Sequence, residues 1–295
     1  MIQQKQKRQT LLGIICISAG AGLALYPWIS NTLMESAASS VISVYSEQVA
    51  DLAGEDISGQ LALAAAYNKE LLESKVTLTD PFLETTSQTS LTTYFDILSF
   101  TDDGMMGYLE IPCISVYLPI YHGTSEEVLA VGAGHLEGTS CPIGGINTHA
   151  VISGHTGLRS AKLFTDLTEM EEGDLFFIHI AGETLAYEVV AISIVLPEDT
   201  ASLTIQEGRD LVTLLTCTPY GVNSHRLLVT GERTEYEETT TGEEEEGSAS
   251  SQWRTIYRRA LRMAVPLLLI SLSVLSIHRT LKKRLSGREK NPHST

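Results

Sequence analysis

The chain has 295 residues, with 20 Lys and Arg against 36 Asp and Glu and a formal net charge of −16 at pH 7. A chain of this length forms one or two domains. Residues 30–252 hold 7 of the basic and 35 of the acidic residues, a net charge of −28 for that part. Such a field repels nucleic acid and disfavours contact with anionic lipid, so we expect no nucleic-acid partner.

An uncharged run of 19 residues, 11–29, follows a basic N-terminal segment. At ~1.5 Å per residue this run spans a bilayer core, and it is too long for the core of an ordinary signal peptide. We therefore predict a transmembrane helix at 11–29. Basic residues favour the cytoplasmic side, so 1–10 is expected to be a cytoplasmic tail and the body to face outward. The alternative to a retained transmembrane helix is a signal peptide that is cleaved after Ala37.

A second apolar run, Met263–Ile277, lies near the C-terminus between basic residues. A core helix is one interpretation. The run follows a low-complexity acidic linker at 234–252, which we expect to be disordered, and arginine stems can extend a short span by snorkelling. We therefore predict a transmembrane helix with its flanks at 253–280 and a cytoplasmic tail at 281–295.

Apolar residues recur at helical spacing in 30–78, with a break at Gly54–Gly59, and predict a pair of packing helices. A polar loop follows at 79–90. It contains Asp80, Pro81 and Phe82, which are an acid, a rigid proline and an aromatic residue. By itself this tripeptide is not specific for any function.

Residues 91–233 contain short apolar runs separated by Gly, Pro and Asp. Several short strands of this kind predict a mainly β domain, either a barrel or a sandwich. Helical insertions fit Glu126–Ala130 and Leu163–Met170. The domain is long enough to bury one hydrophobic core.

Within this domain, 211–233 has the pattern of two antiparallel strands, with Cys217 ending the first and Arg226 opening the second. Symmetric closure of the hairpin would place these two residues opposite each other. A cysteine is a nucleophile only as the thiolate, which a neighbouring positive charge or base favours. Cys217 is therefore a candidate nucleophile, and a small buried hydrophobe is the alternative.

The base has to come from one of the histidines. His155 stands in SGHTG after an apolar strand, where its side chain can point into a cleft. His225 adjoins Arg226 but should face away from it by strand alternation. The other histidines of the body fit ordinary strand and loop positions: His122, His135, His149 and His179. No HExxH or CxxC spacing is present, so we expect no metal site.

The motifs IPCISVYLPIYHGT, GHLEGTS, SGHTG, SAKLFTDL and TLLTCTPYGVNSHRLLVTGER resemble the pilin-polymerising class C sortases. The TLxTC signature of the family ends at Cys217, and its histidine and arginine fall on His155 and Arg226. The class C lid motif, Asp-Pro-aromatic, matches Asp80–Phe82. Two membrane segments also fit this class.

The resemblance implies a closed eight-stranded sortase-type β-barrel at 91–233, with N-terminal helices and a lid loop at 79–90, on the outer face of a Gram-positive cell membrane. Such an enzyme cleaves an LPXTG-type sorting signal between Thr and Gly. It holds the pilin as a thioacyl enzyme and passes it to a lysine amine of another pilin. Anchoring of surface proteins to a cell-wall peptide is the nearest alternative. No metal or organic cofactor is implied.

The resemblance also implies roles for single residues. His155 would be the general acid and then the base, and Arg226 would stabilise the oxyanion or position the substrate. Asp80 would accept hydrogen bonds from Arg226 while Phe82 covers the sulfur of Cys217. An exposed ion pair contributes only ~0–1 kcal/mol, so we expect the lid to open readily.

Some residues depart from the family pattern. The family often has Arg where this chain has Thr156, and Cys113 and Cys141 replace non-cysteine residues. The two extra cysteines form a bridge or are plain thiols. Two rival functions remain. One is a papain-like peptidase, in which Cys and His occur in the reverse order, and the other is a membrane-anchored scaffold.

Overall fold

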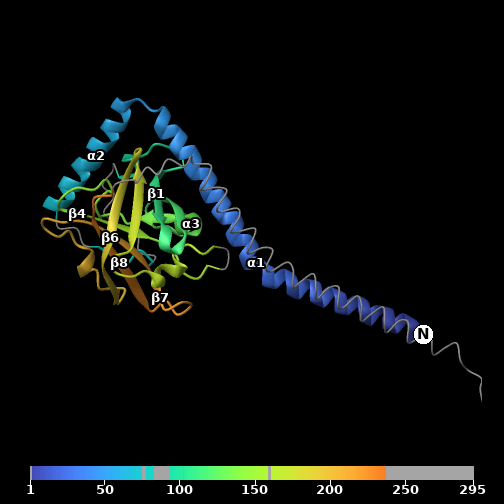
Figure 1. The fold of residues 1–295 in the computed structure, drawn as a ribbon. Coiled ribbons are helices and arrows are strands. Elements are labelled where there is room, and N and C mark those ends of the chain that lie inside the picture. The colour runs from blue at the N-terminus through green and yellow to red at the C-terminus, as the bar shows by residue number, and fades with distance from the viewer. Residues whose placement is uncertain (1, 75–77, 83–93, 102, 159–160, 237–295) are drawn as a thin grey trace, which may run out of the picture. The chain divides into compact units, whose positions relative to one another are not determined.

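The computed structural model describes residues 2–74, 78–82, 94–101, 103–158 and 161–236. The predicted linker beyond residue 236, the second predicted span at 253–280 and the tail at 281–295 lie outside these residues. In the described part, eight strands form one closed barrel (Figure 1). The mainly β domain is confirmed, and it is a barrel and not a sandwich.

The strands follow the short apolar runs of the sequence. They are β1 (Met105–Ile111), β2 (Val116–His122), β3 (Ala133–His135), β4 (Thr148–Ser153), β5 (Leu175–Ile180), β6 (Glu183–Val195), β7 (Asp210–Thr218) and β8 (His225–Arg233). Their order around the barrel is β1-β2-β3-β4-β7-β8-β6-β5, and pairing of β5 with β1 closes it. The pairs β2–β3 and β4–β7 are parallel. The predicted insertions appear as α3 (Glu126–Val131) and a 3₁₀ helix, Thr165–Glu169.

Strand alternation divides the apolar side chains of β7 and β8 between two clusters. Leu214 and Val229 belong to the main core. Leu215 and Leu228, one position away, belong to a second cluster that also contains Phe82. Because successive side chains of a strand point to opposite faces, the second cluster covers the face opposite the main core. Cys217 and Arg226 are two residues from Leu215 and Leu228, so they share this face.

Two helices precede the barrel, α1 (Ile2–Asp51) and α2 (Gly54–Glu73), as the helical spacing predicts. The break lies at Leu52 and Ala53, before the predicted Gly54–Gly59. That prediction was wrong because Glu55 and Asp56 occupy the first turn of α2, where acidic side chains stabilise a helix N-terminus.

Both helices are fixed to the barrel domain by hydrogen bonds from buried side chains. The hydroxyl of Tyr45 in α1 donates to the carbonyl oxygen of Met106 over 2.8 Å and accepts from the amide of Ala181 over 3.1 Å. In α2, the amide of Asn68 donates to the carbonyl oxygen of Cys141 and accepts from its N–H. These contacts satisfy main-chain groups that burial would otherwise leave unpaired.

The run 11–29 lies within α1. Among the helices of the described residues, none is at once long and apolar enough to span a membrane. The span predicted at 11–29 is therefore not supported by the structure, in which α1 continues from that run through polar and charged residues to Asp51.

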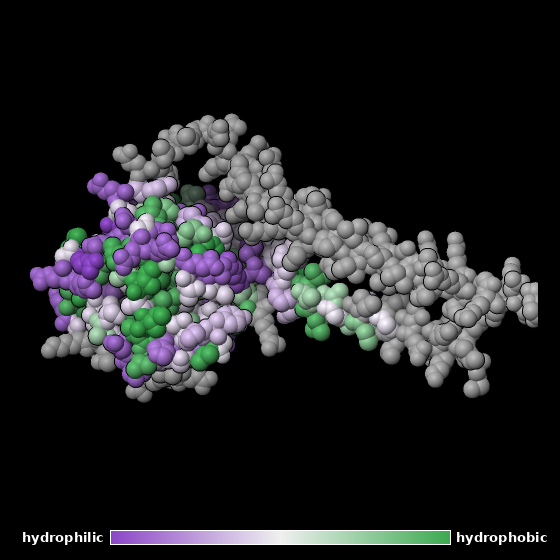
Figure 2. Space-filling view, turned by 60° about the horizontal axis from the view of Figure 1, so that its bottom comes forward, coloured by the Kyte–Doolittle hydropathy of each residue, from purple (hydrophilic) through white to green (hydrophobic). Residues whose placement is uncertain are grey.

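The described surface is chemically mixed. Figure 2 shows hydrophobic side chains grouped among hydrophilic ones on one face of the molecule. Part of the exposed apolar area comes from β6, in which Ile194 is 62% exposed and Ile192 is 37% exposed. The acidic excess of the sequence therefore does not produce a uniformly hydrophilic surface.

Candidate active site

The hairpin of β7 and β8 brings Cys217 and Arg226 together. They are direct cross-strand partners, which confirms the predicted register. Cys217 is 8% exposed and Arg226 is 6% exposed. The Nη1 of Arg226 donates to the carbonyl oxygens of Asn223 and His225 over 3.1 and 3.0 Å. The turn of the hairpin therefore holds the guanidinium beside the thiol.

His155 follows β4, which pairs with β7. The preceding residue, Gly154, donates from its N–H to the carbonyl oxygen of Leu215 over 3.0 Å and accepts from the hydroxyl of Thr216 over 2.6 Å. A Cβ on Gly154 would lie 2.7 Å from the ring of Phe164, so only glycine fits there. These contacts attach the backbone of His155 to the end of β7 that carries Cys217.

The tripeptide Asp80–Phe82 lies over this site. Oδ1 and Oδ2 of Asp80 accept from Nε and Nη2 of Arg226 at 2.8 and 2.5 Å, a bidentate pair. The ring of Phe82 lies 5.2 Å from Cζ of Arg226 and 5.6 Å from the ring of His155, measured from its centroid. One segment therefore touches both of the residues predicted to act beside Cys217.

The predicted contact between Asp80 and Arg226 is present, but the prediction that it is an exposed ion pair was wrong. The side chains of Asp80 and Arg226 are only 1% and 7% exposed. The ~0–1 kcal/mol that an exposed ion pair contributes therefore does not apply here. Removing one partner of a buried pair leaves an uncompensated charge and costs about 3–5 kcal/mol. Phe82, whose ring faces the Arg226 guanidinium, belongs to the apolar cluster that contains Leu215 and Leu228, so the pair lies beside an apolar cluster.

Burial sets the electrostatics of this closed arrangement. It raises the pKa of the Cys217 thiol, Arg226 acts to lower it, and Asp80 acts to raise it. Burial also lowers the pKa of His155, against the field of Glu126. Both effects favour the neutral thiol and the neutral imidazole, so the closed site opposes a thiolate–imidazolium pair.

Glu126 also lies in this region, and its role was not predicted from the sequence. Its Oε2 lies 3.8 Å from Nε2 of His155. The sequence carries no signal for this contact, since the two residues belong to different elements and are brought together by the barrel.

The sortase domain family matches residues 109–234. Among curated proteins, the chain is 33% identical to sortase D of Bacillus subtilis (strain 168) over 130 residues, which are 43% of this chain and 63% of that protein. Sortase A of Bacillus anthracis is 28% identical over 128 residues, 43% of this chain and 59% of that protein. The chain thus spans less than two thirds of these relatives.

Solved structures agree over a longer part of the chain. Sortase C-1 from Actinomyces oris is 48% identical and has a TM-score of 0.57, over 61% of this chain and 99% of that one. Sortase C of Streptococcus pneumoniae is 44% identical with a TM-score of 0.61, over 67% of this chain and 97% of that one. The chain belongs to the sortase family. The solved neighbours named here are class C sortases, and the family consists of cysteine transpeptidases.

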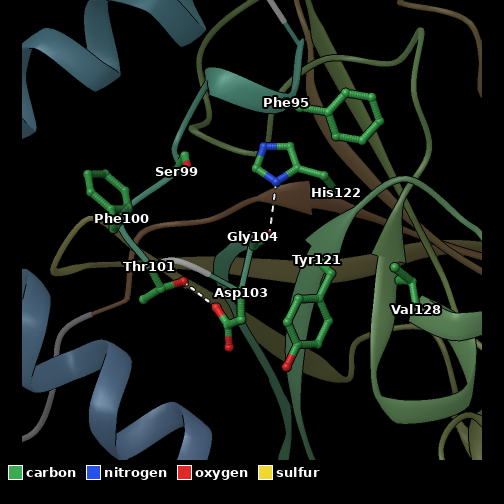
Figure 3. Close-up of a pocket in the computed structure, with 9 residues that line it drawn as sticks. All are labelled: Phe95, Ser99, Phe100, Thr101, Asp103, Gly104, Tyr121, His122 and Val128. Atoms are coloured by element: carbon green, nitrogen blue, oxygen red, sulfur yellow. Dashed lines mark hydrogen bonds between the residues drawn. The ribbon is translucent and has the colours of Figure 1, made fainter.

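A pocket of about 560 Å³ lies elsewhere in this sortase, lined in part by Phe95, Asp103, Tyr121 and His122 (Figure 3). His155, Cys217 and Arg226 do not line it. The two ring nitrogens of His122 lie 2.9 and 2.6 Å from the carbonyl oxygens of Gly104 and Ile97. This histidine therefore holds the segment before β1 in place. The pocket it lines is separate from the candidate active site.

The remaining histidines also have structural partners. His135 and His149 are completely buried and bond to the carbonyl oxygens of Ser140 and Thr204. His225 bonds to the hydroxyl of the adjacent Ser224 and pairs with Thr218 across the hairpin, one position out of phase with Arg226. The ring of His155, in contrast, packs against Phe82.

The extra cysteines of this sortase are free thiols, Cys113 exposed and Cys141 buried. Burial raises the pKa of Cys141 to about 12. A thiol of this kind stays protonated and unreactive at neutral pH. Within the described ranges, no group of three or more His, Cys, Asp and Glu side chains is arranged to hold a metal ion.

Proposed function

We propose that this sortase is a cysteine transpeptidase that cleaves an LPXTG-type sorting signal between Thr and Gly and joins the acyl product to an amine. The observation that carries the proposal is the pairing of Cys217 with Arg226 across the hairpin, at a strand end to which the backbone of His155 is also attached. A thiol, a cation and a titratable base at one strand end are the groups that thioacyl transfer requires.

The proposed reaction has two steps. The Cys217 thiolate attacks the Thr carbonyl carbon, Arg226 stabilises the oxyanion, and the His155 imidazolium gives its proton to the leaving Gly nitrogen as the peptide bond breaks. An acceptor amine then attacks the thioester carbon. It gives a proton to neutral His155, and the Cys217 thiolate leaves.

We further propose that the acceptor is a pilin lysine. Two observations support this assignment. Solved neighbours are described in terms of pilin substrate specificity and of a pilus island, and the class C lid tripeptide lies over the site of this chain. Surface-protein anchoring to a cell-wall peptide is the alternative, and the outer face of the membrane stays the predicted location.

Asp80–Phe82 is proposed to act as an autoinhibitory lid. With Asp80 paired to Arg226, the guanidinium is not free for an oxyanion, and burial in the closed site favours the neutral thiol and the neutral imidazole. Opening exposes both charges to water, so its cost is lower than that of deleting one partner in the closed state. Substrate binding then supplies part of the opening energy.

The deciding experiment incubates the purified protein with an LPXTG-type peptide and two acceptors, a lysine-bearing pilin peptide and a cell-wall peptide. Mass spectrometry should detect a thioester on Cys217 and an isopeptide product on lysine. Transfer only to the wall peptide would refute the pilin assignment. Hydrolysis without any transfer would indicate a peptidase, and no thioester would refute the cysteine mechanism.

A further inference from the structure

One polar atom of the site has no partner. Nε2 of His155 is buried and forms no hydrogen bond with the described residues. Oε2 of Glu126 lies 3.8 Å from it, which is too long for a hydrogen bond but within the range of an ion pair. Buried polar atoms are normally satisfied, so this arrangement needs an explanation.

The backbone of Glu126 is fixed while its side chain is free to move. Glu126 is the first residue of α3, and the hydroxyl of Ser125 caps that helix by accepting from the amide of Val128 over 3.3 Å. The side chain of Glu126 is 85% exposed and that of His155 is 18% exposed. A rotamer change of the carboxylate is therefore enough to shorten the contact to a hydrogen bond.

A neutral His155 does not require a carboxylate partner, whereas the positively charged His155 of the reaction is stabilised by one. In the closed site, Phe82 packs beside His155 and burial lowers the pKa of the imidazole. During transfer, His155 has to carry a positive charge. Glu126 is the charged group that acts on its pKa, and it acts in the direction that favours that charge. The Asp80–Arg226 pair acts on Cys217 instead.

We propose that Glu126 is a positioning residue that accepts a hydrogen bond from Nε2–H of the His155 imidazolium when the lid is open. The bond leaves Nδ1 as the nitrogen that exchanges protons with the leaving and entering amines. This inference rests on the proposed transpeptidase function, to which it adds an acidic partner for the histidine.

The test compares Glu126→Gln with Glu127→Gln. Glu127 occupies the same turn and has the same charge, but it is fully exposed and forms no ion pair with His155 in the described structure. Glu126→Gln should lower kcat/KM of transfer by about 3- to 10-fold, because loss of the carboxylate lowers the pKa of His155 and less of the imidazolium is present. The acid limb of the pH profile should move to lower pH. Glu127→Gln should match the parent, and Glu126→Asp should restore part of the loss.

A second measurement does not require turnover. In the Cys217→Ala background, NMR titration of the His155 ring should give a lower pKa for Glu126→Gln than for the parent, and the difference should shrink in high salt. Equal ring pKa values and equal rates for the two glutamine variants would overturn the role of Glu126. Failure of the proposed function has a different signature, because the parent protein itself would then form no thioester on Cys217 or would show no transfer.

Discussion

Asp80 and Arg226 form a bidentate pair across 146 residues of sequence, with distances of 2.8 and 2.5 Å. The same guanidinium is the cross-strand neighbour of Cys217. In this structure the guanidinium beside Cys217 is therefore occupied by the Asp80 carboxylate. In the proposed mechanism, the position of the lid decides whether Arg226 pairs with Asp80 or acts on the substrate.

Opening the lid should activate the thiol. In the double variant Asp80→Ala, Phe82→Ala, two causes of the raised Cys217 pKa are removed, namely the field of Asp80 and part of the burial. The thiolate then forms at lower pH, so the pH profile of alkylation by a small thiol reagent should shift to lower pH, with a faster rate at pH 7. Hydrolysis of a sorting peptide should also rise.

Asp96→Ala is the control for the lid variant, since it removes an exposed carboxylate and leaves the lid intact. Its alkylation rate should equal that of the parent. Equal rates for the lid variant and the parent would show that the lid does not restrict the thiol. If the shift caused by Asp80→Ala disappears when Arg226 is also replaced, the Asp80–Arg226 contact is the cause.

Replacement of the nucleophile should separate catalysis from folding. Cys217→Ala is expected to abolish transfer with little change in Tm, because a thiol at a strand end contributes little packing compared with a large core side chain. Cys113→Ser should keep full activity. Cys141→Ser should also stay active but unfold at lower temperature, because it buries a hydroxyl in place of a thiol. Substantial transfer by Cys217→Ala would remove this residue from the mechanism.

The base and the cation should be interdependent. His155→Ala and Arg226→Ala are each expected to lower kcat/KM by orders of magnitude, and the double variant should lose less than the product of the two effects, since both act on one transition state. His225→Ala is the matched histidine control and should remain active, because its ring bonds to Ser224. An inactive His225→Ala beside an active His155→Ala would reverse these roles.

Stability should fall in mild acid because of His135. Burial lowers its pKa to about 4 in the folded protein, against about 6.5 in the unfolded chain. The unfolded state thus binds the proton first. The free energy of unfolding is therefore unaffected by protonation of His135 above pH 6.5 and decreases as the pH falls toward 4. At ~1.4 kcal/mol per pH unit, the total loss is up to about 3 kcal/mol.

Urea unfolding between pH 7 and pH 4 measures this loss. The variant His135→Gln should be less stable at pH 7, because it loses the bonds to Tyr94 and Ser140. Its free energy of unfolding should depend less on pH than that of the parent. Parallel curves for the two proteins would show that another group causes the acid sensitivity.

The parts of the site that follow from local pattern were predicted from the sequence. Cys217 and Arg226 belong to one hairpin, in which turn formers and strand periodicity define the register. His155 was a candidate base because it follows an apolar strand, and resemblance to a family then assigned roles to it and to Asp80–Phe82. No local pattern places either segment beside the hairpin of β7 and β8.

Other features were decided by tertiary packing. Periodicity reports which face of a strand is apolar, but it does not report what covers that face. The buried Asp80–Arg226 pair lies beside an apolar cluster to which the lid, β7 and β8 contribute. The approach of Glu126 to His155 depends on how α3 and β4 are placed by the closed barrel. Contacts between distant segments are set by the packing of the whole core, so no local window of sequence contains them.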